Sequence, residues 1–196
     1  RSELVVLSSH VSMFSVRALI LDAIRGHLSQ LNDIQVVVDA LRKEIIHHLS
    51  YPDADWSLND TELKPYQDLL NEIEPKDIMH KNAWLFEDFF VQLPRESEGD
   101  YEYDKEMLRL KEMRNKVIQE IIDTNGCDCI WDFIKIVKCP ESVADSIVSI
   151  SGEQYLDAVC QKYKSHEISE SFTRCFLGVL CQHDVERYQE LAAQIV

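Results

Sequence analysis

The feature that most constrains this chain is the recurrence of apolar residues at steps of three and four, with only five glycines among 196 residues. Such steps place apolar side chains on one face of an α-helix. Glycine-poor segments also offer little of the backbone that cradles phosphate groups or turns sharply around a catalytic nucleophile. The pattern therefore predicts an all-α protein, an array of antiparallel helices with a solenoid-like stack as one form of it.

A strongly amphipathic helix is predicted over residues 34–49. Asn32 and Asp33 precede it and suit a helix start, because their side chains can accept hydrogen bonds from first-turn N–H groups. Its apolar stripe comprises Ile34, Val37, Val38, Leu41, Ile45 and Leu49. Val36 and Ile46 lie off this stripe, so we expect the helix to be sandwiched between neighbouring helices.

Glycine and proline mark further helix boundaries. Residues 3–31 predict one or two helices, with an interruption at Gly26. We expect Pro65 to be the first residue of the following helix, because proline lacks the N–H group that a first turn leaves unpaired. Pro75 then restarts the chain into a short helix, which leads to the aromatic residues at 84–90.

The clearest helix of the second half is predicted over residues 105–124. Its inner face carries Leu110, Met113, Val117 and Ile121. Asn125 and Gly126 follow, and glycine permits the positive φ at which helices commonly end. Beyond them, short apolar stretches alternate with polar breaks, which predicts short antiparallel helices. The breaks are at Pro140, Gly152 and residues 165–171.

A strongly acidic segment, residues 95–104, lies between these two halves. It carries Glu96, Glu98, Asp100, Glu102 and Asp104, and its only apolar side chains after the proline at 94 are Tyr101 and Tyr103. Such a segment is typical of an exposed loop. We therefore predict an N-terminal helical subdomain over residues 1–94 and a C-terminal helical subdomain over residues 105–196, with one continuous domain as the alternative.

The charge balance argues against polyanionic partners. The chain has 35 acidic and 20 basic side chains and a formal net charge of −15, so DNA, RNA and anionic membranes would be repelled unless a basic stripe overcame this field. The densest basic stretch runs from Lys105 to Lys116 and includes Arg114, but it alternates with Glu106 and Glu112. We interpret it as a solvated helix face. No apolar run reaches the length of a membrane span, and we expect neither a nucleic-acid nor a membrane partner.

The six cysteines lie mostly within helical patterns, not at the loop-rich spacings of a disulfide-stapled secreted domain. We therefore expect a cytoplasmic protein with free, buried thiols. Cys127 is a partial exception, because the N-terminus of a helix can activate a thiol.

Two groups of residues include side chains of the metal-ligand types. They are His47, His48, Asp53 and Asp55, and, near the other end, Cys175, Cys181 and His183. Adjacent helical residues face different directions, so His48 falls on the apolar stripe and His47 off it. The paired Cys-x-x-Cys spacings of zinc sites are absent. A small helical metal-binding protein or enzyme that uses one of these groups is therefore the alternative hypothesis.

No motif of an enzyme active site is present, since the sequence lacks a Walker-type glycine loop, H-E-x-x-H and G-x-S-x-G. The acidic segment also lacks the ligand order of a calcium-binding EF-hand. We therefore predict no enzymatic activity, no cofactor and no small-molecule substrate. Large aromatic side chains are the best candidates for a contact surface. They are Trp56, Trp84, Phe89, Phe90, Tyr101 and Tyr103.

Several runs of the sequence carry a family resemblance. They are IHHLSYPDADW at residues 46–56, IEPKDI at 73–78, NAWLF at 82–86, LP at 93–94, the helix at 105–124 with its Asn125-Gly126 stop, and IKIVK at 134–138 before Pro140. Together, over residues 45–150, they resemble the helical regions of very large bacterial proteins with a P-loop NTPase core of the STAND kind. In those proteins long helical regions follow the core, and many of the proteins are suspected of sensing phage infection.

The resemblance implies a helical scaffold or sensor module of a multidomain defence protein, with nucleotide chemistry elsewhere in the polypeptide. None of the family's phosphate-binding motif is present here, so no nucleotide-binding residue carries over. We therefore predict a non-enzymatic module that contacts a protein partner or other domains of the same chain. A spacer that only separates neighbouring domains is a further alternative.

Overall fold

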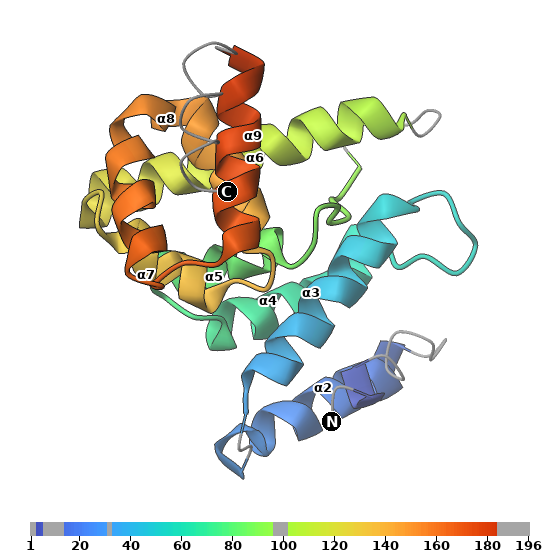
Figure 1. Ribbon diagram of the computed structural model, residues 1–196. Helices are drawn as coiled ribbons and strands as arrows, with labels where there is room; N and C mark the ends of the chain where they lie inside the picture. The colour runs from blue at the N-terminus through green and yellow to red at the C-terminus, as the bar shows by residue number, and fades with distance from the viewer. Residues whose placement is uncertain (1–2, 6–13, 31–32, 96–101, 184–196) are drawn as a thin grey trace. The chain divides into compact units, whose positions relative to one another are not determined.

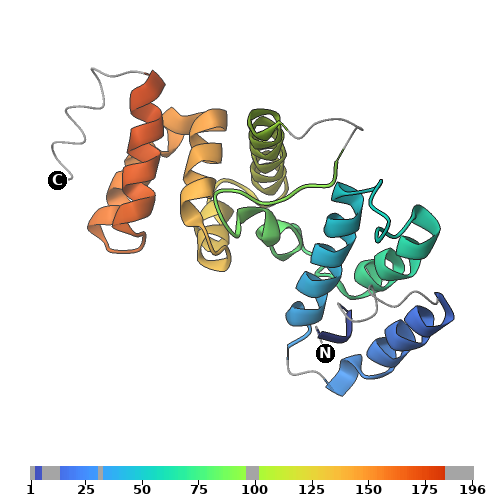
Figure 2. The ribbon, with the colours of Figure 1, turned by 90° about the vertical axis from the view of Figure 1, so that its right-hand side faces the viewer.

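The described residues of the protein, 3–5, 14–30, 33–95 and 102–183 in a computed structural model, form helices joined by turns and no strand (Figures 1 and 2). The all-α prediction is therefore confirmed, while a solenoid-like stack stays a prediction. In chain order the elements are α2 (Phe14–Gly26), η1 (Leu28–Gln30), α3 (Gln35–Ser50), α4 (Asp60–Ile73), α5 (Ile78–Asn82), η2 (Ala83–Phe86), α6 (Tyr103–Asn125), α7 (Cys129–Ile136), α8 (Pro140–Lys164) and α9 (Glu170–His183).

The chain divides into two compact units, neither of which is one continuous stretch. The first unit combines Arg1–Lys76 with Gln92–Tyr101, and the second combines Asp77–Val91 with Glu102–Val196. The sequence places residues 77–91 with the N-terminal half, whereas in the structure they pack with α6, α7 and α8. The backbone N–H of Cys139 donates to the carbonyl oxygen of Phe86 at 2.8 Å, which is one of the links that hold this segment in the second unit.

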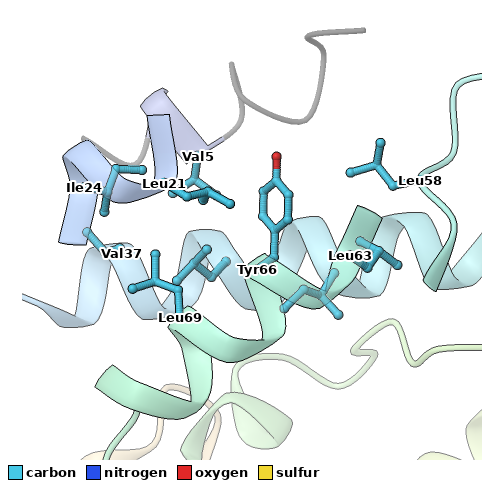
Figure 3. Close-up of a cluster of buried hydrophobic side chains, with 10 residues drawn as sticks. Val5, Leu21, Ile24, Val37, Leu58, Leu63, Tyr66 and Leu69 are labelled. Atoms are coloured by element: carbon cyan, nitrogen blue, oxygen red, sulfur yellow. The ribbon is translucent and has the colours of Figure 1, made fainter. Parts of the chain in front are cut away.

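The core of the first unit lies between α2, α3 and α4. Its buried side chains are Val5, Leu21, Ile24, Val37, Leu41, Ile45, Leu58, Leu63, Tyr66 and Leu69 (Figure 3). From the predicted stripe, α3 contributes Val37, Leu41 and Ile45 to this core, and Leu49 packs against it, whereas Ile34 precedes the helix and is exposed. Of the two residues off the stripe, Ile46 is buried and Val36 is exposed, so α3 is covered on only part of its second face.

The start of α4 differs from the prediction. The helix begins at Asp60, so Pro65 lies inside it and is not its first residue. The reason is a capping box at Asn59: its side chain accepts from the Glu62 N–H at 3.1 Å, and the Glu62 carboxylate accepts from the Asn59 N–H at 3.1 Å. The same carboxylate accepts from Arg17 of α2 at 2.7 Å, which ties α2 to the start of α4.

In the second unit, α8 packs against both α6 and α9, and α7 packs against α6 and α8 (Figure 1). The predicted stop of α6 is confirmed: the helix ends at Asn125, and Gly126 has φ 86° and ψ 166°. The predicted break at Gly152 is a kink within α8, where Ser151 has φ −153° and ψ 34°. Aromatic residues from three elements fill part of this core, with Phe86 and Phe133 edge to face at 5.1 Å and Phe172 and Phe176 stacked within α9.

Candidate interaction surface

The turn that follows η2 is held by one buried side chain, Arg114 of α6. Arg114 is 6% exposed. Its Nε–H donates to the carbonyl oxygen of Leu85 at 2.7 Å, its Nη1 donates to that of Phe89 at 3.0 Å, and its Nη2 donates to that of Asp88. The guanidinium carbon also lies 5.5 Å from the centroid of the Phe86 ring. The backbone of residues 85–89 is therefore fixed to α6 at three points.

A guanidinium suits this position better than any other cation. It is planar and carries five N–H donors in a fixed fork, so a single side chain can reach several carbonyl oxygens at once. Burial lowers the pKa of Arg114, and nearby groups, including the carboxylates of Asp145 and Asp88, oppose that shift. A guanidinium ordinarily loses its proton only far above neutral pH, so the group stays charged and its hydrogen bonds are charge-assisted.

This role corrects the interpretation of the basic stretch as a wholly solvated face. Lys105 pairs with Glu102 at 2.8 Å and Arg109 with Glu106 at 3.5 Å, as expected of opposite charges interleaved on a helix surface. The sequence pattern predicts Arg114 on the same solvated face, and this prediction is wrong because Arg114 is buried. The spacing did hold a signal for its burial, because Arg114 lies four residues from each of two buried residues, Leu110 and Ile118.

The anchored turn presents two of the predicted aromatic residues to solvent. Phe89 is 60% exposed, and Phe90, also exposed, stacks on the ring of Tyr103 with centroids 5.6 Å apart. Tyr103 is the first residue of α6 and is 54% exposed. We call these three residues the Phe89 surface. Of the other predicted contact residues, Trp84 is half-buried in η2, and Tyr101 lies outside the described residues.

The Phe89 surface is bordered by acidic groups. Asp88 precedes Phe89, and Asp104 follows Tyr103; both carboxylates are exposed. Glu87 and Glu102 are also close in sequence, and these two pair with Lys138 at 3.3 Å and with Lys105 at 2.8 Å. The border therefore carries more carboxylates than ammonium groups, and its field favours a cationic neighbour. These carboxylates, Glu87, Asp88, Glu102 and Asp104, all belong to the second unit.

A second exposed aromatic group lies in the first unit. Trp56 is 50% exposed, and its ring stacks on that of His47 with centroids 4.6 Å apart and an interplanar angle of 15°. The ring of Tyr51 meets Trp56 at 5.8 Å and 54°. The guanidinium of Arg95 lies 5.3 Å from the centroid of the Tyr51 ring. We call His47, Tyr51 and Trp56 the Trp56 cluster.

His48 holds the turn that carries Trp56. The hydroxyl of Ser57 donates to the carbonyl oxygen of His48 at 2.9 Å, and the N–H of Leu58 donates to the ring Nδ1 of His48 at 3.2 Å. Accepting this bond requires a lone pair on Nδ1, so the neutral ring carries its proton on Nε2, 4.0 Å from Glu44. Leu58 is itself buried in the core. The two residues that follow Trp56 are therefore fixed by hydrogen bonds to His48.

The side chains of the first predicted metal-ligand group, His47, His48, Asp53 and Asp55, differ in burial. His48 is buried while His47 is exposed against Trp56, as the helical spacing indicated, and Asp53 and Asp55 are exposed in the following turn. In the part of the chain that the structure describes, no three His, Cys, Asp or Glu side chains are arranged to hold a metal ion. The second predicted group is only partly described, since the side chain of His183 falls outside the described residues.

The cysteines are free thiols in varied surroundings. Cys139 is buried as expected, Cys127 is exposed, and Cys129, Cys160, Cys175 and Cys181 are half-buried. Burial raises the pKa of the Cys160 and Cys175 thiols, which disfavours the reactive thiolate at both positions.

Comparison of the chain with family models, with curated proteins and with solved structures gives no match. Among the described residues, no helix has the length and apolar content needed to cross a membrane. The Phe89 surface and the Trp56 cluster are thus the features from which a function can be argued.

Proposed function

We propose that this chain is a non-enzymatic helical module that binds a protein partner, or another domain of the same polypeptide, through the Phe89 surface. The observation that carries the proposal is the anchoring of residues 85–89 by Arg114. Contiguous groups of exposed apolar side chains often mark interaction sites on protein surfaces. Here a buried charged side chain holds the backbone beneath Phe89 in one conformation.

Such anchoring favours binding because it lowers the entropy lost on association. A flexible loop must be ordered when a partner docks, whereas a turn held at three carbonyl oxygens is ordered beforehand. Aromatic side chains are also common among the few residues that dominate interface energies. The stacked Phe90 and Tyr103 rings extend the apolar area next to Phe89.

The acidic border defines the partner's chemistry. Carboxylates at Asp88 and Asp104 favour a segment that places apolar anchors on the rings and lysine or arginine residues at the edge. The resemblance of residues 45–150 to helical regions of STAND-type proteins supports a place for this module in a multidomain bacterial defence protein, where the partner is a sensed protein or a neighbouring domain. The all-α fold agrees with that proposal.

Site-specific photo-crosslinking tests the proposal. A benzoylphenylalanine is placed at position 89, and separately at position 108, in the protein expressed in its own cells. Leu108 is a matched control, because it is 59% exposed on the same helix as Tyr103 but lies about 140° around it. We expect a discrete crosslinked product from position 89 and none from position 108, with the attached peptide rich in lysine or arginine. Equal products from both positions, or none from position 89, would contradict the proposal.

A further inference from the structure

We propose that the Trp56 cluster is a second recognition site, which binds the guanidinium group of an arginine side chain on a protein partner. The Trp56 cluster belongs to the first compact unit and the Phe89 surface to the second. The two proposals therefore rest on separate observations, and either can fail without the other.

The ring of Trp56 is half exposed and has one parallel stacking partner among the described residues. His47 lies nearly parallel to it at 4.6 Å and covers one face. Tyr51 and His48 meet the ring at 54° and 53°, with centroids 5.8 and 5.7 Å away, so neither of them stacks in parallel on the indole. The residue is nevertheless 50% exposed, and among the described residues His47 is the only ring that stacks in parallel on it. An indole face carries negative electrostatic potential and attracts cations, with tryptophan the strongest of the aromatic side chains in this respect.

Cations already lie on the aromatic rings nearby and elsewhere in the chain. In the described residues, Arg95 lies over Tyr51 at 5.3 Å, Arg114 over Phe86 at 5.5 Å and Lys162 over Trp131 at 5.2 Å. The Arg95 contact shows that a guanidinium fits against a member of the Trp56 cluster. Lys162 already lies over the ring of Trp131, whereas no lysine or arginine of the described residues lies over the ring of Trp56.

Local charge favours the same ligand. Asp53 and Asp55 are exposed in the turn that carries Trp56, and each is within three residues of it. Carboxylates in the same turn as the indole favour a cationic ligand over a neutral one. The net charge of −15 adds a long-range attraction for a basic partner. A neutral or acidic ligand would gain neither contribution.

The cluster is also held in place before any ligand arrives. The turn from Tyr51 to Ser57 has backbone hydrogen bonds from Ala54 N–H to the Tyr51 carbonyl oxygen at 3.1 Å and from Ser57 N–H to that of Ala54 at 2.8 Å. The bonds of Ser57 and Leu58 to His48 then fix the residues that follow Trp56. The stack on His47 sets the plane of the indole ring itself. An exposed ring fixed in this way loses little freedom on binding.

The test is an NMR titration of the ¹⁵N-labelled 196-residue protein with a six-residue peptide of alternating arginine and serine, at about 0.15 M salt. The matched probe replaces each arginine with citrulline, which has nearly the same shape and no charge. The chain has three tryptophans, so the indole N–H signals of Trp84 and Trp131 are internal controls for that of Trp56. We expect the Trp56 signal to shift and saturate with the arginine peptide and to stay in place with the citrulline peptide.

Two variants extend the test. Trp56→Leu should weaken binding of the arginine peptide about two- to fivefold, the range expected for an exposed cation–π contact. Trp56→Phe keeps a ring against His47 and should give an intermediate value, which covers the case in which the leucine variant folds poorly. Leu108→Ser, at an exposed position outside both proposed binding surfaces, should leave the affinity unchanged. Equal binding of the two peptides, an unmoved Trp56 signal, or unchanged affinity in both Trp56 variants would overturn the proposal.

Discussion

Arg114 Nε donates to the carbonyl oxygen of Leu85 at 2.7 Å and so joins residues 29 positions apart in the chain. The bond links α6 to the end of η2 across the acidic segment, and the two further carbonyl bonds of the same guanidinium fix the turn that exposes Phe89. One buried charge thus contributes both to the packing of the second unit and to the shape of its proposed binding surface.

Replacing Arg114 should destabilise the protein strongly. Arg114→Met leaves three backbone carbonyl oxygens without their donor, and Arg114→Lys keeps the charge but cannot reproduce the planar fork. We expect losses of at least about 2 kcal/mol for both variants, with lysine the milder. Urea unfolding followed by circular dichroism measures them. Arg109→Lys, a control within the same helix, should change stability by less than about 0.5 kcal/mol. Equal effects at positions 109 and 114 would refute the anchoring role.

The division into two discontinuous units predicts which fragments of the chain fold on their own. A fragment of residues 77–196 contains all of the second unit, whereas one of residues 105–196 lacks the carbonyl groups that Arg114 binds and the buried Phe86 ring that packs on Phe133. We expect the longer fragment to unfold cooperatively on heating and the shorter one to have lost its cooperative transition. Circular dichroism melts of both fragments decide the point, and a shorter fragment as stable as the longer one would contradict this division.

Local spacing was enough to predict α3 and the end of α6. The stripe from Val37 to Ile45 repeats at helical steps, and Gly126 alone supplies the positive φ that ends α6. Two sequence features compete at the start of α4. Pro65 favours a first turn at residue 65, but the capping box at Asn59 starts the helix five residues earlier, at Asp60.

The candidate surfaces were predicted by residue type but not by arrangement. Residue type alone predicts Phe89, Phe90 and Tyr103 as contact residues, and all three are exposed. What places Phe89 on an ordered turn is a set of bonds between Arg114 and carbonyl oxygens at least 25 positions earlier. Carbonyl groups occur at every residue, so no sequence pattern marks the ones that a distant arginine will bind. The stack of His47 on Trp56 likewise depends on the turn between them.

Replacing His166 with glycine should stabilise the protein. His166 has φ 59° at the end of α8, where Glu167 N–H donates to the Lys162 carbonyl oxygen at 2.9 Å and His166 N–H donates to that of Tyr163 at 3.0 Å. This is the Schellman pattern, in which glycine usually occupies the left-handed position. We expect His166→Gly to raise the free energy of unfolding by about 0.5–1 kcal/mol and the melting temperature by a few degrees.

Gly126→Ala is the converse control. Gly126 has a φ of 86°, which disfavours any residue with a side chain. No atom lies within 4 Å of an added Cβ, so the change in stability caused by the substitution measures backbone strain alone. We expect a loss of more than about 1 kcal/mol in the same thermal unfolding assay. A histidine-to-glycine change that destabilises the protein would show that His166 makes a contribution that outweighs its backbone conformation.

Glu141 should make stability depend on pH through its contact with Ser171. The hydroxyl of Ser171 in α9 donates to the carboxylate of Glu141 in α8, and this bond is the largest cause that lowers the Glu141 pKa below its ordinary value of 4.5. A carboxyl group with a lowered pKa in the folded state stabilises the protein fully above the unfolded value. That contribution is lost as the pH falls through the folded value.

Ser171→Ala should therefore raise the Glu141 pKa toward 4.5, as followed by the ¹³C shift of its carboxyl carbon. Because this contact is largely solvent-exposed, we expect the variant to be less stable by only about 0.5 kcal/mol at pH 7, with the difference vanishing near pH 3. Ser149→Ala is the control, since that hydroxyl bonds only to a backbone carbonyl oxygen of its own helix, that of Asp145, and its effect should not vary with pH. A Ser171→Ala deficit that is equally large at pH 3 and pH 7 would mean that the link between α8 and α9 does not act through the ionised form of Glu141.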